Sequence, residues 1–326
     1  MCYSCFTLSV YGSEIWGFEN LKDVEMFHRR FFRILLCSYK FTPNCMLYGE
    51  TNTTDISTKV NIRMINFWEK MECSERPKLS SILCKTMRKD FNNILSKPDD
   101  KMNTSKDNDI RHFKWCRKIK DTLDSMGLSS KWIYGHILDP SFKSIFKQRC
   151  YDVFIQKWNA DLQKNSQCNV YKMFKDSPKI EKYMLKLENA HRFRILKFIM
   201  RVHKLPVTKN RFKFIENDPS TVCPLCDVNE VGNESHYLFK CKYFENERHE
   251  LVPNSVVNKH DRCIAWKNLF KLDEHLLIDV SRFFKIIMNE FECLEDDLRN
   301  NDIILTTKET RGGRKIIPPV RLINCI

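Results

Sequence analysis

The chain has 326 residues and a formal net charge of +14, from 55 Lys plus Arg against 41 Asp plus Glu. This length is enough for about two domains with their own cores, and the positive charge favours a polyanionic partner, nucleic acid ahead of an acidic membrane surface. Only 8 Gly and 11 Pro occur, which together with many amphipathic segments predicts a mainly α fold.

Other bulk features exclude several protein classes. No apolar run reaches the roughly 18–20 residues that a membrane-spanning helix needs. The mildly apolar first ten residues lack a small-residue cleavage site, so we predict no secretory signal. The 15 cysteines are odd in number and scattered, which is typical of reduced thiols. We therefore expect a nuclear or cytoplasmic protein that is not secreted.

The N-terminal third is predicted to form three helices, because apolar residues recur there at intervals of three or four. The first covers Leu21 to Leu36, and the second follows Asp55, a favourable N-cap residue. We expect the apolar stripes of both to lie in the core. The stripe residues are Leu21, Val24, Phe27, Phe31, Phe32 and Leu35 in the first helix and Ile56, Val60, Met64, Phe67 and Met71 in the second. A third helix is predicted over residues 79–94.

The middle of the chain begins with a polar, turn-rich segment, residues 96–108, which we predict to be a linker. Helices are predicted from Ile110 to Met126 and from Asp139 to Asn159. In the second of these, Asp139 would be the cap and Pro140 the first helical residue. Residues 166–178 are expected to be a further connection.

A basic window runs from Asn189 to Ile215, and it contains no acidic residue. Cations interleaved with aromatic rings suit a surface that neutralises phosphates and stacks on unpaired bases. The predicted nucleic-acid contacts are Arg192, Arg194, Lys197, Arg201, His203, Lys204, Lys209, Arg211 and Lys213, beside the rings of Phe193, Phe198, Phe212 and Phe214. Five phosphate contacts would give a log–log salt slope of roughly −3.5 to −4.5. The alternative is an amphipathic helix with Phe193, Leu196, Phe198 and Ile199 in the core.

The segment CPLCDVNEVGNESHYLFKC follows this window and places Cys223, Cys226, His236 and Cys241 in a C-x2-C-x9-H-x4-C pattern. Four such ligands can close a tetrahedral zinc site, which would be structural because no position stays open for a substrate. The polar loop from Asp227 to Asn233 would fold back, and Glu234 and Ser235 would open a short helix.

Two rival arrangements of ligands remain open. Cys2 and Cys5 form a second C-x2-C pair, but that pair has no nearby His or Cys partners. His249 could take the place of His236. No Gly-rich phosphate loop and no nucleophile constellation is evident.

The C-terminal part resumes helical periodicity over residues 263–270 and 276–298. The end of the chain holds one Gly pair, Gly312-Gly313, and one Pro pair, Pro318-Pro319, in the sequence TTKETRGGRKIIPPVRLINCI, and it is predicted to be extended or flexible. Its basic residues Arg311, Arg314 and Lys315 are either solvated or part of a targeting or nucleic-acid tail.

Several segments together resemble non-LTR (LINE-like) retrotransposon reverse transcriptases, in the region that follows the polymerase core. They are YGSEIWG, TPNCMLYGE and KVNIRMINFWEKM in residues 11–71, the RILKFIMRVHKLPVTKNRF stretch with its His-x-Leu-Pro pattern, and CPLC followed by ESHYLFKC. The resemblance extends over residues 1–250. It implies a helical post-polymerase linker that ends in a zinc knuckle and helps to hold template RNA and target DNA.

The chain departs from that family in lacking the polymerase carboxylates. The family's catalysis needs an aromatic-x-Asp-Asp turn, because carboxylates must clamp two metal ions. Neither Asp99-Asp100 nor Asp296-Asp297 has the required aromatic residue, and no nuclease-like set is evident. The resemblance therefore implies a non-catalytic fragment, whose partners would be RNA or single-stranded DNA and the missing polymerase portion, with no membrane and no small-molecule substrate. The alternative is a helical, zinc-containing scaffold that binds proteins.

These predictions divide the chain into a multi-helix bundle, a small CCHC module and a helical C-terminal extension. The predicted parts are a helical region at 1–95, a linker at 96–108, a helical domain at 109–220 that ends in the basic window, the CCHC module at 221–250, C-terminal helices at 251–300 and a flexible basic tail at 301–326.

Overall fold

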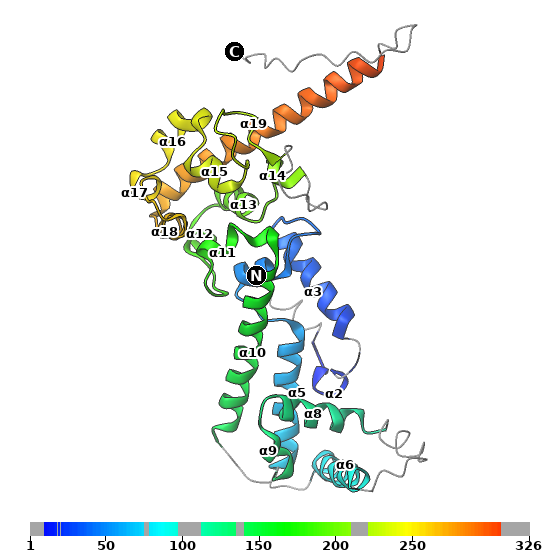
Figure 1. The fold of residues 1–326 in the computed structure, drawn as a ribbon. Helices are drawn as coiled ribbons and strands as arrows, with labels where there is room; N and C mark the ends of the chain where they lie inside the picture. Colours follow the sequence, from blue (N-terminus) through cyan, green and yellow to red (C-terminus); the bar gives the residue numbers. More distant parts are fainter. Residues whose placement is uncertain are drawn as a thin grey trace.

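The computed structural model describes residues 10–17, 19, 21–74, 78–96, 112–134, 140–209 and 221–307, with the backbone alone for residue 209 and residues 295–307. The described chain is mostly helical, as predicted, and it forms no β-sheet; one isolated antiparallel bridge joins Val222 and Val231. The molecule is elongated, with one group of helices at each end (Figure 1). Within the described residues, no helix combines the length and apolarity needed to cross a membrane.

The first group of helices surrounds a core built around Trp68 and Trp132, whose rings stack with centroids 5.8 Å apart. Its helices are α2 (Ser13–Trp16), α5 (Ile56–Glu72), α6 (Leu79–Leu95), α8 (Lys114–Ser125) and α9 (Ser129–Ile133). As predicted, the Asp55 carboxylate caps α5, accepting from the Thr58 amide at 2.9 Å.

The second group has a larger core that extends from Phe32 to Phe291. Its helices are α3 (Leu21–Leu35), α4 (Asn44–Thr51), η1 (Ser166–Cys168), α11 (Tyr171–Phe174), α12 (Lys182–Lys186), α13 (Asn189–Ile199), α14 (Pro206–Lys209), α15 (Glu234–Phe239), η3 (Lys242–Phe244), α16 (Glu245–Leu251), α17 (Asn254–Val257), α18 (Arg262–Leu269) and α19 (Glu274–Thr307). Helix α13 packs along α19, and Phe198 stacks on Phe284 with ring centroids 3.9 Å apart.

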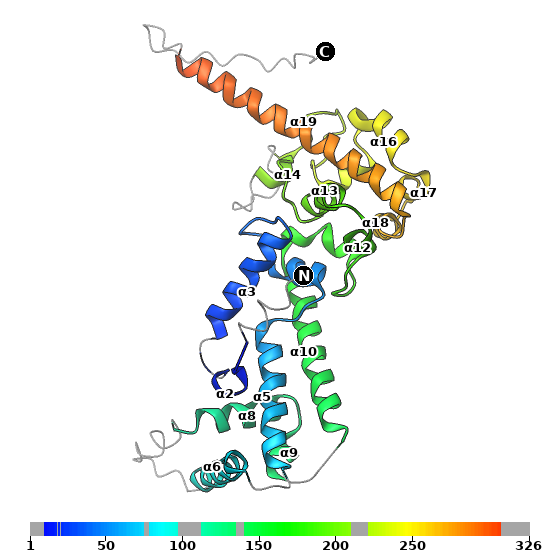
Figure 2. The same cartoon turned by 180° about the vertical axis from the view of Figure 1, so that it is seen from behind.

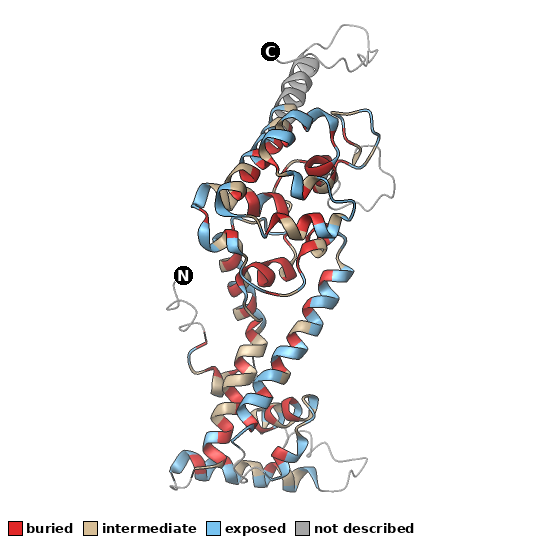
Figure 3. Ribbon diagram, turned by 90° about the vertical axis from the view of Figure 1, so that its left-hand side faces the viewer, coloured by how far each residue is buried: buried red, intermediate tan, exposed pale blue. Residues whose placement is uncertain are grey.

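Helix α10 (Phe142–Lys164) belongs to both groups (Figures 1 and 2). Phe142, Phe146 and Cys150 are buried in the first core, whereas Phe154, Trp158 and Leu162 are buried in the second. The two cores therefore cut across the predicted boundaries, and the CCHC module shares its core with helices from both ends of the chain. Figure 3 shows the buried residues along the inner faces of these helices.

Helix α3 corrects the predicted core stripe. Phe27 is 59% exposed, and the buried residues of α3 are Glu25, His28 and Phe32. The Glu25 carboxylate accepts from the Ile56 amide at 2.6 Å and also bonds the Tyr48 hydroxyl. Because these bonds hold Glu25 on the buried side of α3, Phe27 faces outward, although Phe27 belongs to the predicted apolar stripe.

Other boundaries also differ from the prediction. Helix α10 begins at Phe142 rather than Pro140, with Ser141 at its N-cap, and residue 139 lies outside the described residues. The connection predicted at 166–178 contains η1 and α11, which bury Cys168, Tyr171 and Phe174. Helix α19 continues to Thr307, so the first seven residues of the predicted flexible tail are helical. The rest of that tail and residues 97–108 of the linker lie outside the described residues.

Candidate metal centre and its basic surroundings

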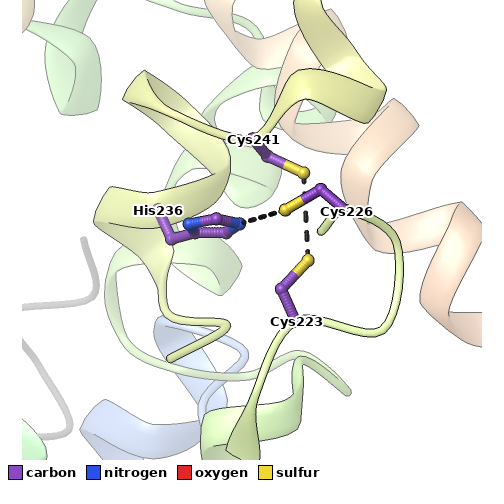
Figure 4. Close-up of side chains that lie close together, drawn as sticks. All are labelled: Cys223, Cys226, His236 and Cys241. Carbon is purple, nitrogen blue, oxygen red and sulfur yellow. Dashed lines mark hydrogen bonds between the residues drawn. The ribbon is translucent and has the colours of Figure 1, made fainter. Parts of the chain in front are cut away.

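The four predicted ligands of the CCHC module come together in one cluster. The ligand atoms of Cys223, Cys226, His236 and Cys241 lie within 4.8 Å of one another, and their side chains point toward a common centre (Figure 4). The sulfurs of Cys223 and Cys241 are 3.9 Å apart, and the sulfur of Cys226 is 3.4 Å from His236 Nε2. Tetrahedral bonds of about 2.3 Å to sulfur and about 2.0 Å to nitrogen would separate such ligands by roughly 3.5–3.8 Å. The cluster could therefore hold a metal ion.

The loop between the ligand pairs closes by short-range backbone contacts. The Cys223 amide donates to the Glu230 carbonyl at 2.9 Å, and the Gly232 amide donates to the Thr221 carbonyl at 2.8 Å. A side chain at Gly232 would collide with the Tyr237 hydroxyl, so the close approach requires glycine. Asn233 then caps α15, its side chain accepting from the His236 amide at 2.8 Å. This order of contacts places His236 on the first turn of α15, as predicted.

A second layer of side chains orients the imidazole. His236 Nδ1 lies 3.4 Å from the Glu230 carboxylate, which also pairs with Lys240 at 2.7 Å. The bond to Lys240 lowers the pKa of Glu230 and outweighs its partial burial. A carboxylate on Nδ1 would leave Nε2 to ligate a metal ion and would make the imidazole more basic.

Arg248 is a buried cation behind Cys241 and was not predicted. Its guanidinium donates to the carbonyls of Leu238, at 3.0 Å, and Tyr237, at 3.3 Å, and it also bonds the carbonyl of Cys241. These carbonyls belong to the end of α15 and the turn after it, which would otherwise lack intrahelical partners. Burial lowers the pKa of Arg248, while the electrostatic interaction with Cys241 opposes that shift. Arg248 therefore fixes the turn that presents Cys241.

The paired thiols of Cys223 and Cys241 share their titration. Their contact lowers the pKa of Cys223 to about 3 and raises the pKa of Cys241. One sulfur of the pair is accordingly a thiolate at neutral pH, and a metal ion would displace the proton from the other.

Two residues of the predicted nucleic-acid surface contact a buried carboxylate instead. Arg201 and His203 converge on the buried Glu234, at 3.1 Å from Arg201 Nε and 3.0 Å from His203 Nε2. Burial raises the pKa of Glu234, but the Arg201 charge and the His203 bond outweigh it and bring the pKa to about 2. The window itself contains no acidic residue, but Arg201 has an acidic partner outside it, Glu234. Both residues hold the CCHC module to the segment before it.

The other predicted contacts divide between exposed, half-buried and undescribed positions. Lys197 is exposed, whereas Arg192, Arg194 and Lys204 are half-buried. Arg192 donates to the Met184 carbonyl at 2.9 Å. The side chains of Lys209, Arg211 and Lys213, and the rings of Phe212 and Phe214, lie outside the described residues. Phe198 is fully buried and Phe193 is half-buried, so α13 has the apolar core face of the alternative amphipathic helix.

Of the rival ligands, only His249 lies among the described residues, and it is not part of the cluster. His249 is exposed on α16 and is absent from the four-residue group. Cys2 and Cys5 lie outside the described residues. The sequence offered no signal for Glu234 or Arg248, beyond their being charged residues near the ligands, because their partners become neighbours only on folding.

Comparisons of the chain with models of protein families, with curated proteins and with solved structures found no match.

Proposed function

We propose that this chain is a non-catalytic fragment of a LINE-like reverse transcriptase that binds RNA or single-stranded DNA and is organised by a structural zinc ion. The observation that carries the proposal is the convergence of Cys223, Cys226, His236 and Cys241 within 4.8 Å, directly joined to the basic window through Glu234. Three thiolates and one imidazole in near-tetrahedral spacing suit Zn²⁺ better than oxygen-preferring metals.

The nucleic-acid part of the proposal depends on the outer face of the basic window. Arg194 and Lys197 lie on α13, with Lys197 exposed and Arg194 half-buried, while Ile195 and Leu196 between them face the core. Arg194 and Lys197 would place positive charge on the outer face of α13. Phosphate oxygens would be the groups bound, and affinity would then depend strongly on salt.

The metal experiment compares two cysteine variants. Metal analysis of the purified protein should give one zinc per chain, and Cys226→Ser should lower this value. Cys263→Ser is the matched control, because Cys263 is exposed and lies outside the cluster. Unchanged zinc in Cys226→Ser would reject the ligand set.

The nucleic-acid experiment is a binding titration over a salt series with labelled single-stranded RNA and DNA. The double variant Arg194→Gln/Lys197→Gln should weaken binding and reduce the salt slope by about 1 for each cation that met a phosphate. Lys85→Gln/Lys89→Gln is the control, since both lysines are exposed on α6 in the other group of helices. Weak binding that is indifferent to salt would reject this part of the proposal.

A second candidate function is a helical scaffold that binds another protein, such as the polymerase portion of the same family. It is favoured by exposed apolar residues on α3 and α6. Met26 is 64% exposed, Ile34 71%, Leu79 73% and Leu83 52%. Capture of the partner should then survive nuclease treatment and be lost in Leu79→Lys/Leu83→Lys.

A further inference from the structure

A cavity of about 600 Å³ lies where the turn between α3 and α4 meets the C-terminal end of α10. This volume is within the usual range for small-molecule sites, roughly 300–1,000 Å³. The lining includes the cations Arg33, Lys40 and Lys164 and a single carboxylate, that of Asp161. The cavity therefore has an excess of positive charge and suits an anion.

Two buried polar groups of the cavity wall have no hydrogen-bond partner within the described part of the chain. They are the Thr42 hydroxyl, on a residue that is 5% exposed, and Arg33 Nε. Other atoms of the guanidinium are already bonded, since Arg33 Nη2 donates to Asn44 Oδ1 at 2.8 Å and to the Thr42 carbonyl at 3.3 Å. A buried donor without a partner costs about 1–3 kcal/mol. Both atoms are closed to solvent in this structure, so a ligand with acceptor oxygens would pair with them after the Thr42 and Arg33 side chains rotate toward the cavity.

The remaining walls of the cavity also favour a nucleotide. Helix α4 begins there after Pro43 without a side-chain cap, and the start of a helix attracts negative charge. Phe41 lines the cavity and is 48% exposed, with Lys40 Nζ 4.7 Å from its ring centre. An aromatic face beside cations can stack a base while the cations meet its phosphate.

We propose that this cavity binds one phosphorylated nucleoside, either as a free nucleotide or as one unit of a single strand. Arg33, Lys164 and Thr42 bind the phosphate, and Phe41 stacks on the base. The site uses no residue of the basic window and no metal ligand. As a free-nucleotide site it is independent of the function proposed above, and as a single-strand site it rests on that function. The sequence predicted no small-molecule substrate, and a free nucleotide would be a small-molecule ligand beyond that prediction.

The test uses the full chain and three probes: ATP, inorganic phosphate and a fluorescent single-stranded DNA 12-mer. Thr42→Val removes the hydroxyl while keeping the shape, and it should weaken binding of ATP or the 12-mer about fivefold. Lys164→Ala should weaken binding of the same probe and, with the 12-mer, reduce the salt slope by about 1. Binding of ATP would identify a free nucleotide, and binding of the 12-mer alone would identify a strand.

Lys147→Ala is the matched control, because Lys147 is also exposed on α10 but lies about 25 Å along the helix from Lys164. It should bind like the unaltered protein. The proposal is overturned if neither ATP nor the 12-mer binds, if Thr42→Val and Lys164→Ala bind normally, or if Lys147→Ala weakens binding equally. Equal affinity for phosphate and ATP, unchanged in Phe41→Ala, would overturn the nucleoside assignment.

Discussion

His203 Nε2 lies 3.0 Å from the carboxylate of Glu234, the first residue of α15. Arg201 approaches the same carboxylate at 3.1 Å. Arg201 and His203, which precede the CCHC module in the chain, thus contact the helix that carries His236. The same contacts have two effects: they hold the CCHC module in place, and they neutralise the buried Glu234 carboxylate.

Glu234→Gln should destabilise the fold by about 3–5 kcal/mol, because it leaves the Arg201 charge without its buried partner. Chemical denaturation measures this change. Glu250→Gln is the control, since Glu250 is exposed on α16, and it should change stability by less than about 0.5 kcal/mol. Equal stability of the two variants would contradict the buried ion pair.

Glu230→Gln should weaken metal binding about 10–100-fold, because the carboxylate orients His236 through Nδ1. Competition with a chromophoric chelator measures the affinity. Lys240→Gln removes the other partner of Glu230 but not the contact with the imidazole, so its effect should be much smaller. A larger loss in Lys240→Gln than in Glu230→Gln would show that Glu230 does not act through the histidine.

His28 should make the fold less stable as the solution becomes acidic. Burial lowers the pKa of His28 to about 3, with help from the charges of Lys59 and Arg29 and against that of Asp55. Below pH 6.5 the unfolded chain binds a proton that the folded chain does not, so stability falls as the pH decreases from 6.5 toward 3. The loss should be about 2–3 kcal/mol between pH 6.5 and 4.5.

The measurement is urea denaturation of the unaltered protein and of His28→Leu across this pH range. The variant should lose less stability on acidification, and any acid release of the metal is common to both proteins. Parallel pH profiles would contradict the role of His28.

Lys175→Met should destabilise the protein by about 3–5 kcal/mol. Lys175 is fully buried and lies 3.3 Å from Glu50, which accepts from Tyr171 at 2.7 Å and Tyr183 at 2.5 Å. Removing the cation leaves the Glu50 carboxylate buried without its ion pair. Adding Glu50→Gln should recover part of the loss in a double-mutant cycle, and full additivity would contradict direct coupling.

The sequence was sufficient to predict those features that depend on residues close together in the chain. The four candidate metal ligands lie within one short segment, and their spacing alone predicted the cluster that the structure contains. The Asp55 cap and most helix positions were predictable for the same reason, because caps and apolar periods are local signals.

Residues that act across long separations could not be predicted. The face of α3 depends on Glu25, whose partner amide at Ile56 belongs to another helix. Likewise, the cation count of the basic window could not show that Arg201 would be neutralised by Glu234. Apolar periodicity records which residues favour burial, but a buried charge follows its partner, and the partner is set by the tertiary fold.

The first turns of α10 lie in one core and its last turns lie in the other. The helix is therefore a continuous connection between the two ends of the molecule. A break within it would separate the residues that α10 contributes to one core from those that it contributes to the other. Truncated variants of the protein should therefore begin or end outside residues 142–164. We also expect the two ends of the molecule to unfold together.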